Sequence, residues 1–199
     1  MYHPVSSEND AAGATRHRFV ALGDSITWGF PEGTHASWVA LAARASGVEI
    51  INMGVNGDTL AGMRARLGRV LAARPVACIV TGGTNDAALG RPVPDMAADL
   101  GAMVEALANA GVVPVIGMPP PFLDARCERI LAGYRQFVNT LAGTRHVRVV
   151  PFDRAFRSAD GTVGAGLLAD VAHPAPAGYE AMAEMLLRTG ILQRGGNGG

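Results

Sequence analysis

The sequence predicts an α/β fold in which helices cover both faces of a parallel sheet. Five short runs rich in Val and Ile alternate along the chain with longer segments that begin and end like helices. The five runs lack the clean polar alternation of strands with one wet face, so we expect strands buried on both faces. Alternating strands and helices favour a parallel sheet with helices on its two sides.

The expected elements are bounded by ordinary start and stop signals. Ser37 precedes one helical segment as a cap, and Pro94 and Gly111 bracket another. The strands are expected at 18–23, 48–55, 75–83, 112–118 and 147–152, and the helices at 37–46, 58–74, 94–111, 124–143 and 176–190.

Length and composition indicate a globular protein. The chain has 199 residues, of which 49% are hydrophobic and 17% charged, a balance typical of a folded domain rather than a disordered chain. We expect a single domain over residues 17–193. The segments 1–16 and 194–199 are expected to be disordered.

Charge and hydropathy exclude several classes of partner. The formal net charge is zero, so bulk electrostatics steers the protein toward neither nucleic acid nor an anionic membrane. Uninterrupted apolar runs stay well short of the roughly 18 residues that a membrane span needs. With no signal peptide evident, the simplest location is the cytoplasm. Cys78 and Cys127 are not expected to form a disulfide framework.

In such folds the ligand site lies beyond the carboxyl ends of the strands. Four of the five loops at that edge carry polar groups suited to a site. The five loops are 23–25, 54–59, 82–86, 119–122 and 168–179.

A serine, a histidine and an acid in these loops suggest nucleophilic catalysis. Ser25 follows the first strand and opens a helix, so its hydroxyl would face the cleft; the alternative is a plain helix cap. Asp170 precedes His173 by three residues, which lets the carboxylate hold the imidazole as the base of a triad. The alternative for this pair is a surface turn closed by His-Pro.

Two further residues are expected to stabilise an oxyanion. The Asn85 side chain is a neutral donor, and the two glycines before it would let the backbone approach a ligand closely. Gly57 offers a backbone N–H, as does Ser25 itself. A turn-forming asparagine and a simple Asn-Gly turn are the alternatives for Asn85 and Gly57.

Other catalytic motifs are missing from the sequence. It contains no phosphate-binding P-loop and no pair of histidines at metal-ligand spacing, so no metal is expected. Thr27 stands where a G-x-S-x-G elbow needs its second glycine, which disfavours the common α/β-hydrolase fold.

Four blocks of the sequence together resemble the signature blocks of the GDSL, or SGNH, hydrolases. They are "GDSIT" at 23–27, "NMGVNGDT" at 52–59, "GGTND" at 82–86 and "DVAHP" at 170–174. The resemblance implies a flavodoxin-like three-layer α/β/α fold around a five-stranded parallel sheet. It also implies cofactor-independent hydrolysis of esters or thioesters, with Ile26 as a conservative departure from the motif.

The resemblance also assigns roles by position. Ser25 resembles the nucleophile and first oxyanion donor of the family, and Asp170 and His173 resemble its acid and base. Gly57 and Asn85 resemble the remaining oxyanion donors, with Gly54 as the second-ranked glycine.

The substrate is expected to be a small neutral ester with a short acyl chain. Five residues are candidates for the walls of an acyl pocket, with ordinary packing under the loops as the alternative: Trp28, Phe30, Met118, Pro119 and Phe122. An acyltransferase or a thioesterase would use the same triad. A non-catalytic flavodoxin-like binding module is the rival class, and a homodimer that uses an apolar helix face is a further possibility.

Overall fold

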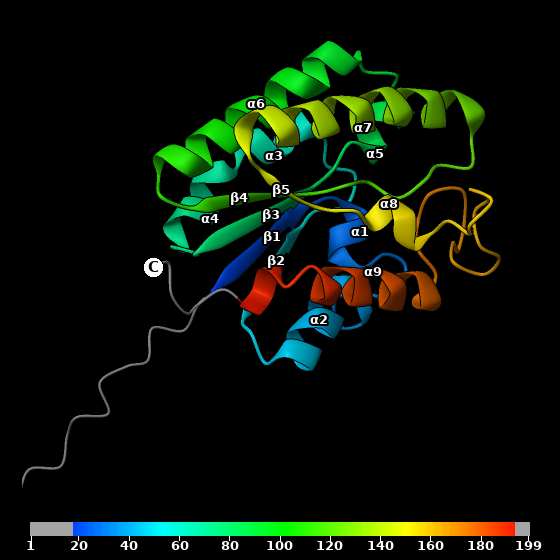
Figure 1. The fold of residues 1–199 in the computed structure, drawn as a ribbon, viewed down its shortest axis with the longest axis horizontal. Helices are drawn as coiled ribbons and strands as arrows, with labels where there is room; N and C mark the ends of the chain where they lie inside the picture. Colours follow the sequence, from blue (N-terminus) through cyan, green and yellow to red (C-terminus); the bar gives the residue numbers. More distant parts are fainter. Residues whose placement is uncertain (1–17, 194–199) are drawn as a thin grey trace, which may run out of the picture.

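The computed structural model describes residues 18–193 and contains a five-stranded, fully parallel sheet (Figure 1). The segments 1–16 and 194–199, expected to be disordered, lie outside the described residues. The strand order is β2-β1-β3-β4-β5, which confirms the predicted fold class. The strands are β1 (Phe19–Gly23), β2 (Ile50–Gly54), β3 (Ala77–Thr81), β4 (Val113–Gly117) and β5 (Arg148–Val150).

Four long helices form where the sequence predicts them, and the remaining helices are short. The long helices are α2 (Trp38–Ser46), α6 (Val93–Asn109), α7 (Ala125–Arg145) and α9 (Pro176–Arg188). The shorter elements are α1 (Ser25–Trp28), η1 (Thr34–Ala36), α3 (Leu60–Ala65), α4 (Leu67–Ala72), α5 (Thr84–Ala88), α8 (Phe152–Ala155) and η2 (Ile191–Gln193).

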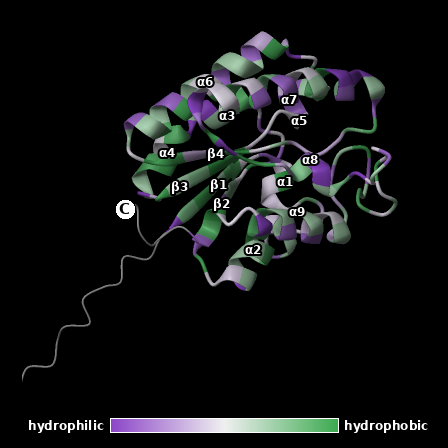
Figure 2. Cartoon of the chain, viewed as in Figure 1, coloured by the Kyte–Doolittle hydropathy of each residue, from purple (hydrophilic) through white to green (hydrophobic). Residues whose placement is uncertain are grey.

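The helices form two layers on opposite faces of the sheet. In Figure 1, α3, α4, α6 and α7 lie on one side of the strands, and α2 and α9 lie on the other. Successive strand residues alternate between the two cores: Phe19 and Ala21 belong to the α2–α9 core, and Val20 and Leu22 to the α6–α7 core. Figure 2 shows hydrophobic strands between amphipathic helices, as expected for strands buried on both faces.

The prediction of a single helix over 58–74 is wrong. The chain forms two short helices there, α3 and α4, and the break falls at Arg66, whose φ of −103° and ψ of 12° leave the helical region. The first helix is capped by Thr59, whose hydroxyl accepts a hydrogen bond from the Gly62 N–H, rather than by Asp58. Asp58 therefore lies in the loop before α3.

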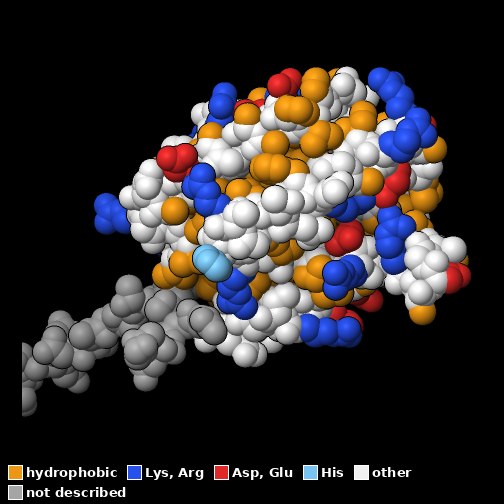
Figure 3. All heavy atoms as spheres, turned by 45° about the horizontal axis from the view of Figure 1, so that its top comes forward, with side chains coloured by type: hydrophobic (Ala, Val, Ile, Leu, Met, Phe, Trp, Pro, Cys, Tyr) orange, Lys and Arg blue, Asp and Glu red, His pale blue; other side chains and the backbone are white. Residues whose placement is uncertain are grey.

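Charged side chains are spread over the surface of the described residues (Figure 3), and both cysteines are buried. Figure 3 shows arginine and acidic side chains interspersed with apolar ones on the side that carries α6 and α7. Cys78 and Cys127 are both free and buried, and burial raises the pKa of the Cys78 thiol to about 12. Among residues 18–193, every helix is too short or too polar to cross a membrane.

Candidate active site

An open cavity of about 250 Å³ lies where four chain segments meet at the carboxyl edge of the sheet. This edge is where an open parallel sheet with the order 2-1-3-4-5 binds ligands, at the point where the strand order reverses. The lining residues come from the loops after β1, β2 and β3 and from the segment before α9. They are Ser25, Phe30, Asn56, Gly57, Asn85 and His173.

Ser25 is the first residue of α1 and is separated from the end of β1 by Asp24 alone. Asp24, not Ser25, caps this helix, because its Oδ1 accepts a hydrogen bond of 3.0 Å from the Ile26 N–H. The alternative of Ser25 as a plain cap is therefore excluded. The Ser25 hydroxyl is left to face the cavity, where its Oγ lies 3.0 Å from Nε2 of His173.

His173 and Asp170 lie in a tight loop before α9. The loop is closed by a hydrogen bond from the Ala169 N–H to the His173 carbonyl, and Leu123 anchors it by donating to the Val171 carbonyl. Within it, Asp170 Oδ2 lies 2.7 Å from Nδ1 of His173. Ser25, His173 and Asp170 thus form a continuous hydrogen-bonded series across 148 residues of sequence.

The Asp170 carboxylate is held in its charged form. Burial acts to raise its pKa, but hydrogen bonds from the backbone N–H groups of His173 and Ala172, and from the His173 ring, outweigh this effect. The net result is a pKa below the usual range. Oδ1 receives both backbone N–H groups, which leaves Oδ2 directed at the imidazole.

Gly57 and Asn85 lie on the cavity wall together, although they come from different loops. Gly57 has a φ of +78°, in the left-handed region, within a turn closed by a bond from the Asp58 N–H to the Val55 carbonyl. Asn85 lies in α5, and its Nδ2 donates to the Asp58 carbonyl at 2.9 Å. This bond uses one of the two amide hydrogens and fixes the orientation of the other.

Gly54, the second-ranked glycine, has a packing role. Its N–H is already bonded to Oδ1 of Asn52 at 2.9 Å, and it is not among the residues that line the cavity. A side chain there would lie 2.2 Å from the backbone nitrogen of Trp28. The glycine therefore allows α1 to approach β2 closely.

The two glycines before Asn85 are closely packed against neighbouring helices. A Cβ on Gly82 would lie 2.7 Å from the Met63 methyl group, and one on Gly83 would lie 3.0 Å from the Tyr134 ring. Both residues are buried. The missing side chains leave room for side chains of α3 and α7.

Of the five residues proposed to wall an acyl pocket, Phe30 lines the cavity. Its ring lies against His173, with ring centroids 4.7 Å apart, and 39% of the residue is exposed. Met118 lies in the α6–α7 core, and Phe122 packs on a small cluster around Leu131. Trp28 is half-buried and Pro119 is buried, and neither contributes to the cavity wall.

Sequence reasoning missed Asn56 and Arg66. Asn56 lines the cavity beside Gly57, and its place in a loop already marked as functional was a signal for it. Arg66 binds Asp58 and the carbonyl groups at the ends of two strands. No sequence motif marks it, because it lies within the helix expected over 58–74.

The charge state of Asp24, next to Ser25, is set by burial. Desolvation, followed by the negative charges of Asp86 and Asp58, raises its pKa to about 7. Its Oδ2 has no hydrogen-bond partner within the described part of the protein. Asp24 is therefore largely protonated in mildly acidic solution, while its Oδ1 still caps α1.

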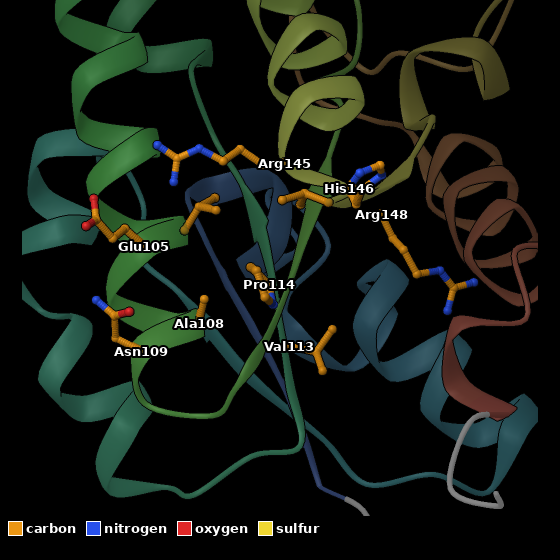
Figure 4. Close-up of a pocket in the computed structure, with 10 residues that line it drawn as sticks. Glu105, Ala108, Asn109, Val113, Pro114, Arg145, His146 and Arg148 are labelled. Atoms are coloured by element: carbon orange, nitrogen blue, oxygen red, sulfur yellow. The ribbon is translucent and has the colours of Figure 1, made fainter. Parts of the chain in front are cut away.

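A larger cavity, of about 410 Å³, lies at the opposite end of the sheet (Figure 4). Its walls include the starts of β4 and β5 and the ends of α6 and α7. In Figure 4, Arg145 extends toward α6, whereas Arg148 points away, and its Nη2 donates to the Thr189 carbonyl. None of its ten lining residues is a serine, threonine or cysteine. Size alone therefore does not identify the reactive site.

The fold and this site together have the form of a serine hydrolase, and comparison with known proteins identifies the family. The model of the GDSL-like lipase/acylhydrolase family matches residues 21–181. The chain belongs to this family, and it is a carboxylic ester hydrolase.

Individual relatives agree with this assignment. The chain is 28% identical over 180 residues to esterase TesA of Pseudomonas aeruginosa, with 86% of each protein covered. A lipolytic protein of the G-D-S-L family from Desulfitobacterium hafniense aligns with a TM-score of 0.82 and 28% identity, over 86% of this chain and 98% of the other. A G-D-S-L family member from Veillonella parvula shares the fold, with a TM-score of 0.78 and 24% identity over 89% and 98% of the two chains.

Proposed function

We propose that this protein hydrolyses short-chain carboxylic esters, with Ser25 as nucleophile, His173 as general base and Asp170 as the orienting acid. The observation that carries the proposal is the series from Ser25 Oγ to His173 Nε2 at 3.0 Å and from His173 Nδ1 to Asp170 Oδ2 at 2.7 Å. Both distances are within the reach that proton transfer requires.

The reaction follows from this geometry in two steps. His173 Nε2 takes the Ser25 proton as Oγ attacks the ester carbonyl, and the resulting imidazolium then protonates the departing alcohol. Water enters next, gives its proton to the same nitrogen and attacks the acyl-enzyme, which releases the carboxylic acid and restores Ser25. Asp170 holds Nδ1–H throughout, so Nε2 is the nitrogen that is free to accept.

Three N–H groups would stabilise the charge that develops on the carbonyl oxygen. They are the backbone N–H groups of Ser25 and Gly57 and the second amide hydrogen of Asn85. The N–H groups of Ser25 and Gly57 have no hydrogen-bond acceptor among the described residues. Each such donor typically contributes about 2.7–4 kcal/mol of transition-state stabilisation.

The size of the cavity supports a preference for short acyl chains. Its volume of about 250 Å³ is below the roughly 300–1,000 Å³ of sites that enclose drug-sized ligands. The Phe30 ring bounds it next to His173, and the deeper candidates Met118 and Pro119 are packed elsewhere. A long acyl chain would have to lie over the surface, with little apolar area removed from water.

The test is hydrolysis of p-nitrophenyl esters from acetate to decanoate by the wild type and by Ser25→Ala. We expect kcat/KM to be highest for the short esters and to fall by about three orders of magnitude or more in the variant. Equal turnover by both proteins would refute the role of Ser25, and a maximum at decanoate would refute the acyl preference. Parallel assays with a thioester and with an added acceptor alcohol measure thioesterase and acyltransferase activity at the same site.

A further inference from the structure

Arg66 links the ends of two strands to the loop that carries Gly57. Its Nη2 donates to the Gly23 carbonyl at 2.8 Å, and its Nη1 donates to the Met53 carbonyl at 2.7 Å. Its Nε donates to Asp58 Oδ2 at 2.7 Å. The Arg66 side chain is only 16% exposed and that of Asp58 11%, so this is a partly desolvated ion pair.

Two of the three acceptors of Arg66 lie close in sequence to the proposed oxyanion donors. Gly23 is two residues before Ser25, at the end of β1. Asp58 directly follows Gly57, and its carbonyl accepts the bond from Asn85 Nδ2 at 2.9 Å. One guanidinium group therefore binds the residue two before Ser25 and the residue directly after Gly57, and the second of these also accepts the hydrogen bond from Asn85.

The local chain is shaped to bring this guanidinium to the loop. The helix expected over 58–74 is interrupted at Arg66, where the backbone leaves helical geometry between α3 and α4. Gly62 provides the space for the carboxylate, because a Cβ there would lie 1.9 Å from Asp58 Oδ1. Arg66 itself does not line the cavity and would not touch a bound ester.

We infer that Arg66 is a positioning residue of the oxyanion hole, which it holds in register with the Ser25 nucleophile. The inference rests on the proposed function. Arg66 meets its three acceptors with three separate nitrogens, which the planar guanidinium holds in fixed directions. A lysine carries its three N–H groups on one nitrogen, so it cannot reach all three acceptors at once. Oxyanion donors act mainly on charge that appears in the transition state, so their misplacement lowers kcat more than it raises KM.

Arg64 provides a matched control in the adjoining helix α3. It lies in α3, two residues before Arg66, and its Nε is 3.3 Å from Asp99 Oδ1, in an ion pair that includes no residue of the cavity wall. Its side chain is 53% exposed. Replacing Arg64 removes a charge and an ion pair from α3 without removing a hydrogen bond to the Gly57 loop.

The experiment compares Arg66→Met, Arg66→Lys and Arg64→Met with the wild type on p-nitrophenyl acetate. Reactive sites are counted by complete reaction with a p-nitrophenyl phosphonate, so kcat is expressed per intact site and loss of folded protein does not count. We expect Arg66→Met to lose about 10- to 100-fold in kcat with little change in KM, since a displacement of about 1 Å costs on that order. Arg66→Lys should lose a similar factor, and Arg64→Met should match the wild type.

An unchanged kcat per titrated site in both Arg66 variants, or a rise in KM alone, would overturn the inference. If Arg66→Met yields no folded protein, Arg66→Lys decides the question, because it keeps the charge and changes only the geometry. Ser25→Ala, measured beside them, separates the two proposals. Loss of activity in Ser25→Ala with full activity in the Arg66 variants refutes the role of Arg66 alone, whereas full activity in Ser25→Ala refutes the proposed mechanism and the inference together.

Discussion

Asp170→Asn should inactivate the enzyme more thoroughly than removal of the carboxyl group altogether. In the structure, Oδ1 of Asp170 accepts the backbone N–H groups of Ala172 and His173 at 2.8 and 2.7 Å. An asparagine has one acceptor oxygen, and these two donors will hold it in the place of Oδ1. Its NH2 group then occupies the place of Oδ2 and donates to Nδ1 of His173.

The consequence is the wrong imidazole tautomer. With Nδ1 as acceptor, the ring proton lies on Nε2, which faces Ser25 Oγ at 3.0 Å and can no longer accept the serine proton. We expect a loss of about 10⁴-fold in kcat, or about 5 kcal/mol of transition-state stabilisation. Asp170→Ala leaves Nδ1 without a partner and allows either tautomer, so its loss should be smaller.

The assay is kcat for p-nitrophenyl acetate, with far-UV circular dichroism as the check that each variant is folded. Nitrogen-15 NMR of the imidazole reports the tautomer directly, and Asp170→Asn should show the proton on Nε2. Equal activity of Asp170→Asn and the wild type would refute the triad assignment. A greater loss in Asp170→Ala than in Asp170→Asn would refute the tautomer argument.

Four further predictions concern neighbouring residues. Asn85→Ala should lower kcat by about 10²- to 10³-fold. A rise in KM with an unchanged kcat would show that the amide binds the ground state instead. Gly54→Ala should destabilise the fold severely in thermal unfolding, because its Cβ would meet the Trp28 backbone at 2.2 Å, whereas Gly57→Ala has free space and should cost only about 1 kcal/mol for its positive φ. Phe30→Ala should shift the preferred ester of the p-nitrophenyl series toward longer chains, and an unchanged chain-length profile would contradict its role as a wall. Burial gives the Asp24 carboxyl a pKa of about 7 in the folded protein, against 3.8 for the same group in the unfolded chain. The stability that this difference contributes is fully present below pH 4 and is lost as the pH rises through 7. From pH 5 to pH 8, the wild type should therefore lose roughly 3 kcal/mol more stability in urea than Asp24→Asn, and parallel pH profiles would contradict the burial argument.

Much of the fold was predictable because it depends on local patterns. Buried parallel strands are continuous apolar runs, and the capping residues Ser37 and Asp124 mark the starts of α2 and α7. A helix that opens at Ser25 was expected, but the short helices α5 and α8 were not predicted, since four or five residues carry too little periodicity. The break at Arg66 was missed for another reason: its side chain binds carbonyl groups of β1 and β2, and nothing nearby in the sequence records those contacts.

The sequence by itself determined the class of chemistry and the loops in which it lies. Parallel strands align their carboxyl ends, so polar residues that follow them must gather at one edge, and the four motif blocks predict which of these residues take part. Only the tertiary structure decided which groups meet there. Gly57 lines the cavity and Gly54 does not, and Phe30 lines it without Met118 or Phe122. The guanidinium of Arg66 binds the loop that carries Gly57. These outcomes depend on distances between segments far apart in the chain, which side-chain packing sets and sequence spacing does not.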